Sequence, residues 1–600
     1  MLAPDTRILL TSALTPPPGL RLDGAIATAF SLDPAVLLEA PVHLAVLDAR
    51  HNGEPDPLFL LEGVRRHAKN ISVYVQRGRM QIPRTVRPTP LFALLEAMIV
   101  EVASPRDGVF HPKVWAIRFV GPEANPTPRY RLLVLSRNMT ADASWDLCLR
   151  LDGDVTGQKR EANAPLAHFF RLLPRLATGS VAPAKTRQAE AFARELMQVD
   201  WELPEGFEEL RFYLPGEKGF DWQPPLKTER MVAVSPFCSD ATLLSVTRNA
   251  ARRVLVSRPE TLAGLKEETL RHFDSCLHLH EAAESDDGEE RPKQPTAAGL
   301  HAKLCLWESR RTRAVHTHVL MGSANLTTAA FSRNVEILVE LSGHQNRVGS
   351  LEHFLGPDGM GEFLVTFAPD DAVAVDAARQ EAEACAERAR MALAEAKLEL
   401  DCRAAAQNDL WQLSLRGPIP PLEGITGARV WPITVSKEQA APLPCDGVAD
   451  LSLGAFSLSS LTGLIAFALH TAHPDVTVNL VRNLPVKGLP EERTAAILQS
   501  VISSQKDFLR YLSLLLSDDA ATQASGEGAR LYAGLSRLAD GGDAALLEEL
   551  VRAFCRSPDT LKHIQKFVDD ISRGKDRAII PEDFLRLWRV FEKAGKVRHA

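Results

Sequence analysis

The sequence predicts an α/β protein made of two pseudo-symmetric α/β/α halves, followed by a long helix, a small β domain and a helical C-terminal region. Three observations lead to this prediction. The 600-residue chain is too long for one hydrophobic core. The same order of strands and helices occurs twice, and each copy carries the same pair of polar motifs in the same place. An internal duplication explains this recurrence better than chance does.

The first half is assigned to residues 1–175 and the second to residues 229–370. From Ala25 the first half shows a short apolar strand and a helix-like segment, then runs with strand composition: AIATAF, DPAVLLEA, VHLAVLDA, ISVYVQRG, FHPKVWAIRFV, YRLLVLS and LCLRLDG. The second half repeats this order with MVAVSPF, DATLLSVTRNA, RRVLVS, LHLHEA, LHAKLCLW, THVLMGS and VEILVEL. The stretch AFSLDPAVLL aligns with PFCSDATLL. This alignment places Asp33 and Asp240 at the heads of equivalent helices, where aspartate is a good N-cap.

The remaining chain divides into four segments. Residues 176–228 carry a helical pattern with Pro and Gly breaks and are predicted to form a helical connector. Residues 371–409 have no Gly or Pro, which predicts one long helix. Residues 410–486 alternate in polarity between turns and are assigned as a small β domain, and residues 487–600 as a helical C-terminal domain. The charged stretch EAAESDDGEERPKQPTAAG is predicted to be a mobile acidic loop.

Composition excludes several classes of protein. No window reaches the roughly 18 uncharged apolar residues of a membrane span, and the N-terminus lacks the pattern of a signal peptide, so a cytoplasmic location is the default expectation. The eight cysteines form no C-x-x-C pair, which indicates neither a disulfide framework nor a zinc site. A net charge of -7 offers no general basic face for nucleic acid. Any site for a polyanion must therefore be local.

Two copies of one polar motif are the main functional signal. The first copy provides His111 and Lys113, then Ser136, Asn138 and Asp146. The second provides His301 and Lys303, then Ser323, Asn325, Asn334 and Glu336. In each copy His and Lys are one residue apart on a predicted strand, so both side chains leave the same face. A pseudo-twofold axis would bring two imidazoles and two ammonium groups around one cleft.

This set suits phosphodiester cleavage through a covalent intermediate. One histidine attacks phosphorus, and the other protonates the leaving oxygen and later removes a proton from water. The lysines and the amides of Asn138 and Asn325 would stabilise charge on the non-bridging oxygens, so the reaction needs neither a metal nor another cofactor. Glu336 and Asp146 are expected to support the histidines by accepting a proton from the far ring nitrogen. The histidine pairs at 278/280 and 316/318 lack further ligands at fixed spacing and are interpreted as strand faces.

The duplicated His-x-Lys with a downstream Ser-x-Asn resembles the phospholipase D superfamily over roughly residues 25 to 345. The second copy, GSANLTTAAFSRNVE, resembles the bacterial nuclease branch, and the first, SRNMTADASWD, resembles tyrosyl-DNA phosphodiesterase. The aspartate of the usual His-x-Lys-x4-Asp is replaced by Arg118 in the first copy and Glu308 in the second. The resemblance implies a metal-independent phosphodiesterase with a phosphohistidine intermediate. It favours His111 as nucleophile and His301 as general acid.

The motif specifies a phosphodiester but not its source. Nucleic acid, with DNA favoured, is the first hypothesis because the second copy is nuclease-like and basic residues cluster near the motif, where they could follow a nucleic-acid backbone: Arg118, Arg137, Arg310 and Arg311. A lipid-directed phospholipase D or phosphatidyl transferase is the alternative, although no basic amphipathic helix rich in Trp or Phe is evident. The third is a catalytically silent binding scaffold. Because the net charge predicts weak unaided binding, we expect a protein partner to dock on the C-terminal helical region, as in a bacterial defence or repair assembly.

Overall fold

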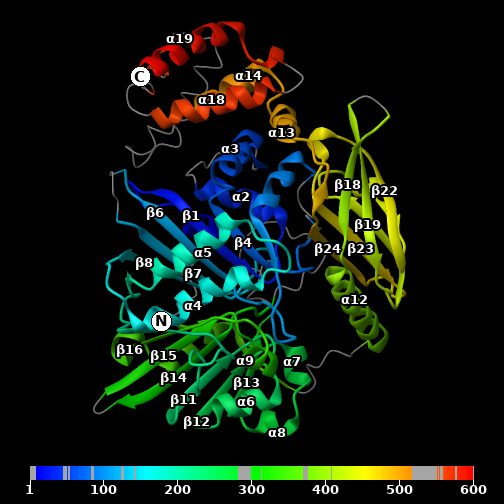
Figure 1. The fold of residues 1–600 in the computed structure, drawn as a ribbon. Helices are drawn as coiled ribbons and strands as arrows, with labels where there is room; N and C mark the ends of the chain where they lie inside the picture. Colours follow the sequence, from blue (N-terminus) through cyan, green and yellow to red (C-terminus); the bar gives the residue numbers. More distant parts are fainter. Residues whose placement is uncertain are drawn as a thin grey trace.

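The computed structural model describes the chain except for residues 1–8, 45–49, 52–53, 83–86, 123–126, 141–143, 281–298, 312–313, 369–375, 407–408, 517–546, 548–549, 552, 554–557, 574–576 and 599–600. The predicted acidic loop falls almost wholly outside the described residues. The mixed α/β class is confirmed, with several sheets and a helical C-terminal region (Figure 1). No helix among the described residues has the length and apolar character needed to cross a membrane.

The first half is built on a seven-stranded sheet. Its strands are β1 (Arg21–Ala29), β4 (Ile71–Gln76), β5 (Ile99–Val102), β6 (Val114–Val120), β7 (Arg129–Leu135), β8 (Cys148–Val155) and β9 (Val199–Trp201), in the order β5-β4-β1-β6-β7-β8-β9. β1 pairs in parallel with β4 and antiparallel with β6. Because helices or another sheet cover both faces, the last six residues of β1 are buried, and all of them except Thr28 lack a polar side chain. Its helices are α1 (Leu10–Leu14), α2 (Pro34–Leu44), α3 (Pro57–His67), α4 (Ala164–Leu172) and α5 (Pro183–Leu196), and a short hairpin pairs β2 (Arg50–His51) with β3 (Glu54–Pro55).

The second half repeats this topology. Its strands are β10 (Glu209–Tyr213), β11 (Thr228–Val234), β12 (Ala250–Val256), β13 (Ser275–Leu279), β14 (Leu304–Arg311), β15 (Ala314–Gly322), β16 (Leu338–His344) and β17 (Leu364–Thr366), in the order β10-β16-β15-β14-β11-β12-β13-β17. Here β11 pairs in parallel with β12 and antiparallel with β14, as β1 does with β4 and β6. The short helices of this half are α6 (Asp240–Thr247), α7 (Pro259–Ala263), α8 (Glu267–Arg271), α9 (Thr328–Ser332), α10 (Gln345–Val348) and α11 (Leu351–Leu355). The shared strand order supports the internal duplication.

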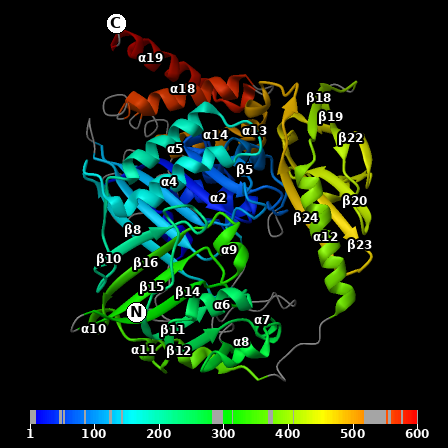
Figure 2. The same ribbon diagram turned by 60° about the horizontal axis from the view of Figure 1, so that its bottom comes forward.

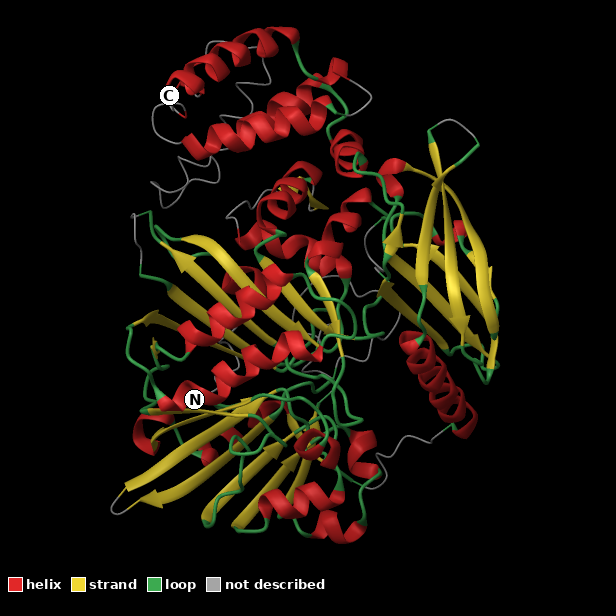
Figure 3. Cartoon of the chain, in the orientation of Figure 1, coloured by secondary structure: helices red, strands yellow, loops and turns green. Residues whose placement is uncertain are grey.

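One hydrophobic core joins the halves. It contains side chains of both sheets together with those of α4 and α5, such as Phe169, Phe170 and Phe192. Figure 3 shows these two helices between the sheets. The predicted connector is only partly helical: α5 covers the first sheet, then β9 extends that sheet and β10 extends the second. The connector therefore belongs to the two halves, because each half takes one edge strand from it.

The C-terminal part begins with α12 (Ala377–Glu395) and a two-sheet β sandwich. The sandwich contains β18 (Glu399–Ala404), β19 (Leu410–Ile419), β20 (Ile425–Pro432), β21 (Ala441–Leu443), β22 (Gly447–Ser457), β23 (Leu464–Thr471), β24 (Thr477–Asn483) and β25 (Val486–Lys487), in sheets β22-β19-β18-β25 and β21-β20-β23-β24. The prediction of one helix over 371–409 is wrong after Glu395. Leu398, Leu400 and Cys402 are buried with a period of two, so the chain gains more by joining the sandwich as β18 than by continuing the helix.

The helices α13 (Arg493–Val501), α14 (Gln505–Leu516), α18 (Pro558–Ser572) and α19 (Glu582–Arg598) follow. They share one hydrophobic core with α2 and α3 of the first half, above which they lie in Figure 1. The prediction that VHLAVLDA forms a strand is wrong for its first residues, because α2 runs to Leu44 and buries Val42 and Leu44 in this core. The second half has no equivalent cover among the described residues.

Candidate active site

The two His-x-Lys segments meet where the halves face each other. They lie just before β6 and β14 and not within those strands as predicted, because each segment pairs with the opposite half. The backbone N–H of His111 donates to the carbonyl of Val335 at 3.0 Å, and that of His301 donates to the carbonyl of Trp145 at 2.9 Å. The neighbouring residues form two parallel bridges, Phe110 with Val335 and Trp145 with Leu300. These equivalent contacts place both histidines in one site across the pseudo-twofold axis.

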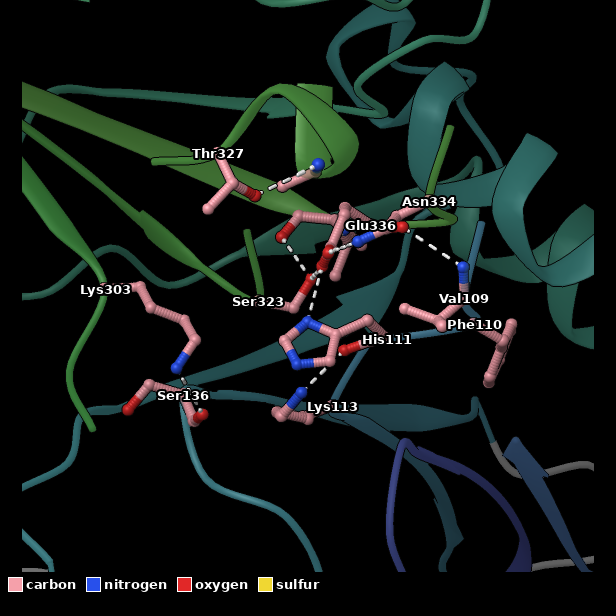
Figure 4. A network of polar contacts seen from close by, with 12 residues as sticks. Val109, Phe110, His111, Lys113, Ser136, Lys303, Ser323, Thr327, Asn334 and Glu336 are labelled. Carbon is pink, nitrogen blue, oxygen red and sulfur yellow. Dashed lines mark hydrogen bonds and ion pairs between the residues drawn. The ribbon is translucent and has the colours of Figure 1, made fainter. Parts of the chain in front are cut away.

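His111 is held by a carboxylate from the other half. Its Nδ1 lies 3.0 Å from Oε2 of Glu336. A carboxylate can only accept, so Nδ1 carries the proton and Nε2 has the lone pair. In Figure 4 this second nitrogen points to the side of the site on which Lys113 and Lys303 lie. The edge of the Phe30 ring packs against the imidazole, with 5.1 Å between ring centroids.

Glu336 is buried in a network of donors. The Ser323 hydroxyl donates to Oε2, and Nδ2 of Asn334 donates to Oε1 at 3.0 Å. Asn334 in turn accepts from the backbone of Val109 at 3.1 Å (Figure 4). Burial alone would raise the pKa of Glu336, but His111, Lys113 and Ser323 outweigh it and lower the pKa below its usual value. Glu336 therefore remains a carboxylate and keeps the His111 tautomer fixed.

His301 has a different partner from the one predicted. By position Asp146 is the counterpart of Glu336, since it follows Trp145 as Glu336 follows Val335. However, Nδ1 of His301 lies 2.9 Å from the backbone carbonyl of Ser136, and Asp146 lies 3.6 Å from Nε of Arg137. The carbonyl fixes the same tautomer without adding a negative charge. The prediction that Asp146 supports a histidine is therefore corrected.

The two lysines are buried between the histidines. Lys113 and Lys303 are 1% and 2% exposed, and each donates from Nζ to the carbonyl of the histidine in its own motif at 2.8 Å. Nζ of Lys303 also lies 3.5 Å from the Ser136 carbonyl and 3.3 Å from Nδ1 of His301. Burial lowers the pKa of Lys303 to about 7 and that of Lys113 well below its usual value. A bound anion would therefore stabilise the charged form of both lysines.

The histidines are neutral without an anion. Burial lowers the pKa of His111 to about 4, although Glu336 opposes the shift. Burial, followed by Lys303 and Lys113, lowers the pKa of His301 to about 2. A bound phosphodiester would add a negative charge close to these groups. It would favour their charged forms and so supply the conditions for acid catalysis.

The serines and asparagines of the two motifs differ in their hydrogen-bond partners. Ser136 Oγ accepts from the backbone of Leu147 at 2.8 Å, and Ser323 Oγ accepts from that of Ile337 at 3.0 Å, so both hydroxyls tie loops together. Oδ1 of Asn138 accepts from the backbone of Ser31 at 3.3 Å. Oδ1 of Asn325 is buried and has no hydrogen-bond partner among the described residues. The two amides are thus held differently, although their motifs match.

Two of the four predicted substrate-binding arginines lie away from the histidines. Arg118 lies near the far end of β6, where it pairs with Asp23 and Glu195. Arg310 and Arg311 end β14, and seven residues of strand put Arg310 roughly 23 Å from Lys303; Arg310 pairs there with Glu229. The side chain of Arg311 lies outside the described residues. Arg137 adjoins the site through Ser136, as predicted. Closeness in sequence was a poor guide for the other arginines, because each residue of an extended strand adds about 3.3 Å to the distance from the motif.

Two aromatic–arginine pairs beside the histidines were not predicted. The guanidinium of Arg79 lies 4.6 Å from the Phe30 ring centroid, and that of Arg258 lies 5.0 Å from the Phe237 centroid. Nε of Arg258 donates to the carbonyl of Leu300, next to His301, at 2.9 Å. The alignment of AFSLDPAVLL with PFCSDATLL already pairs Phe30 with Phe237. That alignment could have pointed to the two phenylalanines as equivalent residues of the site.

One group of metal-ligating side chains occurs among the described residues. Ligand atoms of Glu208, His316 and His344 lie within 4.8 Å of one another, on β15, β16 and the segment before β10. His316 is seven residues from Ser323 along an extended segment, roughly 23 Å from the histidine site. The group is therefore separate from the paired motif.

The fold and site define a duplicated α/β protein with paired His, Lys and Asn side chains at the junction of its halves. Solved structures of similar fold include yeast tyrosyl-DNA phosphodiesterase, with 12% identity and a TM-score of 0.35 over 57% of this chain and 86% of the yeast chain. A single-residue mutant of that enzyme gives 12% and 0.35 over 56% and 88%. No family model and no curated protein matches the sequence. At this level of similarity, we base the function on the site geometry.

Proposed function

We propose that this protein is a phosphodiesterase that cleaves nucleic acid, with DNA favoured, through a phosphohistidine on His111. The observation that carries the proposal is the buried His111–Glu336 pair, placed beside two lysines and close to a second histidine from the other half. A structural role explains this arrangement poorly, because burying two ammonium groups side by side is unfavourable without an anionic ligand.

The first step forms the covalent intermediate. Nε2 of His111 attacks phosphorus, a P–N bond forms and the bond to the leaving oxygen breaks. His301 gives its Nε2 proton to that oxygen. Lys113 and Lys303 stabilise negative charge on the non-bridging oxygens as it shifts in the transition state. Glu336 stabilises the positive charge that the His111 ring gains.

The second step releases the product. His301, now neutral, removes a proton from water while the water oxygen bonds to phosphorus and the P–N bond breaks. His111 returns to its neutral form with Nδ1 still donating to Glu336. All positive charge at the phosphate comes from protein side chains, so we expect turnover to persist in EDTA.

Nucleic acid is the substrate we favour, since Arg137 and Arg258 and the exposed ring of Phe237 lie around the histidines. Arginines contact phosphates and aromatic rings stack on bases. We include in this proposal a protein partner that binds the C-terminal helices, where Val590 of α19 is 62% exposed, and a role in bacterial defence or repair. The partner role predicts that Val590→Asp weakens co-purification with the partner and leaves cleavage by the isolated protein unchanged.

The test is cleavage of labelled single-stranded DNA, double-stranded DNA, RNA and phosphatidylcholine in EDTA. We expect nucleic-acid cleavage that is lost in His111→Ala and in His301→Ala but retained in His353→Ala, which removes an exposed histidine. His301→Ala quenched in alkaline detergent, which preserves the P–N bond, should accumulate more labelled phosphoenzyme than wild type with a substrate that has a good leaving group. Turnover of phosphatidylcholine alone would identify a lipid enzyme, and cleavage by His111→Ala would refute the mechanism.

A further inference from the structure

The Phe–Arg pairs beside the histidines are equivalent in the two halves but differ in surroundings. Phe30 follows β1 and Arg79 follows β4, while Phe237 follows β11 and Arg258 follows β12. Each pair therefore lies at the carboxyl ends of two parallel strands in its own half. The duplication accounts for their equivalent positions.

The C-terminal part of the chain contacts Arg79 of the first pair and the loop that carries it. Arg79 forms an ion pair with Glu387 of α12, and Arg390 of α12 donates to the carbonyl of Gly78 at 3.2 Å. Gly78 has a φ of 73°, and a Cβ there would lie 2.4 Å from the Cβ of Ala394. The bridge between Met80 and Val481 fixes the same loop to the sandwich. Figure 2 shows α12 and the sandwich beside the first half.

The second pair is open. Phe237 is 48% exposed, and the Arg258 guanidinium lies over one side of its ring. The pair is fixed to the site, because Arg258 donates to the residue that precedes His301. Its charge also lowers the pKa of His301, behind the larger effects of burial, Lys303 and Lys113.

We propose that Phe237 and Arg258 form the binding platform for one nucleoside next to the scissile phosphodiester. The base stacks on the face of Phe237 opposite Arg258, and Arg258 contacts the adjoining phosphate. This inference rests on the proposed nucleic-acid phosphodiesterase activity and extends it to a specificity-determining site. Because α12 holds Arg79 of the equivalent pair and the Phe30 ring packs against His111, we place the stacked nucleoside on the side of the second half.

A substrate with one phosphodiester tests the proposal. Thymidylyl-thymidine is compared with two analogues in which hydrogen replaces one base, on the 5′ or the 3′ nucleoside. With Phe237→Ala, we expect kcat/KM to fall about 5- to 150-fold for substrates that retain the stacked base. The analogue lacking that base should be cleaved equally by wild type and variant. Phe237→Leu, which keeps the apolar bulk, should show the same selective loss, and Leu226→Ala, which truncates another exposed apolar side chain, should show none.

The outcomes separate the two proposals. An equal loss on all three substrates, or no loss on thymidylyl-thymidine, overturns the platform while leaving the phosphodiesterase intact. Cleavage by His111→Ala, or none by wild type, overturns the enzyme mechanism. In the latter case, fluorescence anisotropy of labelled dT10 on the His111→Ala background still measures stacking. Affinity that Phe237→Leu leaves unchanged there overturns the platform as well.

Discussion

Glu336→Gln isolates the charge that supports the proposed nucleophile. The amide keeps the size of the carboxylate and can still accept from Nδ1 of His111 through its oxygen, while its NH2 group then faces the Nδ2 donor of Asn334, a cost that the unfolding control reports. What disappears is the attraction between a carboxylate and the positive charge that the ring gains as the P–N bond forms. For charge centres about 4 Å apart at an effective dielectric constant of about 20, this attraction is about 4 kcal/mol. The remaining amide dipole recovers part of it, so we expect kcat to fall about 10²- to 10³-fold.

The assay is single-turnover cleavage of labelled single-stranded DNA in EDTA, with rapid quenching to measure phosphoenzyme formation. The matched control is Asp146→Asn, which removes the counterpart charge in the other half. Because His301 contacts the Ser136 carbonyl, this control should cost less than about tenfold. Urea unfolding of both variants checks that the fold is kept. If Glu336→Gln retains more than a tenth of the rate, or Asp146→Asn loses more than it does, the assignment of His111 as the carboxylate-supported nucleophile is wrong.

Other predictions concern pH and the basic residues. His111 has a pKa of about 4 in the folded protein and near 6.5 when unfolded, so the unfolded chain binds more protons between these values. His111 alone should therefore lower the free energy of unfolding by up to about 3 kcal/mol from pH 7 to pH 4, and the total fall should be smaller by that amount in His111→Asn, as urea titrations at both pH values would reveal. Binding of vanadate at pH 7 should take up more than one proton per site, because His301 and the buried lysines all gain charge beside an anion, and His301→Gln should take up about one proton fewer. Calorimetry in buffers of different ionisation enthalpy measures the uptake, and equal uptake by wild type and His301→Gln contradicts the acid role. Arg137→Gln should raise KM for DNA several-fold. Arg118→Gln should leave KM unchanged but lower the free energy of unfolding by about 1 to 3 kcal/mol, because it breaks the pairs with Asp23 and Glu195. A raised KM in Arg118→Gln and an unchanged one in Arg137→Gln would restore Arg118 to the binding site.

The duplication could be read from the sequence because its signals are local. Each half repeats its strand order along the chain, and the His-x-Lys segments bring His and Lys together within three residues. Helix starts were less exact. Asp33 accepts from the backbone of Ala35 at 2.8 Å and caps α2 as expected, whereas Ser239 occupies the N-cap position of α6 and Asp240 is its first residue. Local rules predict an end to within a residue or two.

Contacts between distant segments were beyond local rules. Residues 396–409 have the composition of a helix, but their apolar side chains fit the sandwich core, and tertiary packing overrides propensity. The partner of His301 is a backbone carbonyl, and no residue type signals such an acceptor. Arg258 lies 43 positions before His301 in the chain and reaches the site only because β12 ends beside it. These features become visible once the register of the sheets is fixed.

In the proposed mechanism, the departures from symmetry explain why the two histidines take different roles. A perfectly duplicated site would give both imidazoles the same partner and the same proton affinity, and neither could specialise. Here Glu336 favours positive charge on His111, whereas burial, Lys303 and Lys113 lower the pKa of His301 further, and only the neutral carbonyl of Ser136 opposes this shift. A ring stabilised as a cation can carry a phosphoryl group, and a ring that holds its proton weakly can give it to a leaving oxygen. A supporting carboxylate was expected at both histidines, but in this mechanism it favours catalysis only at the nucleophile.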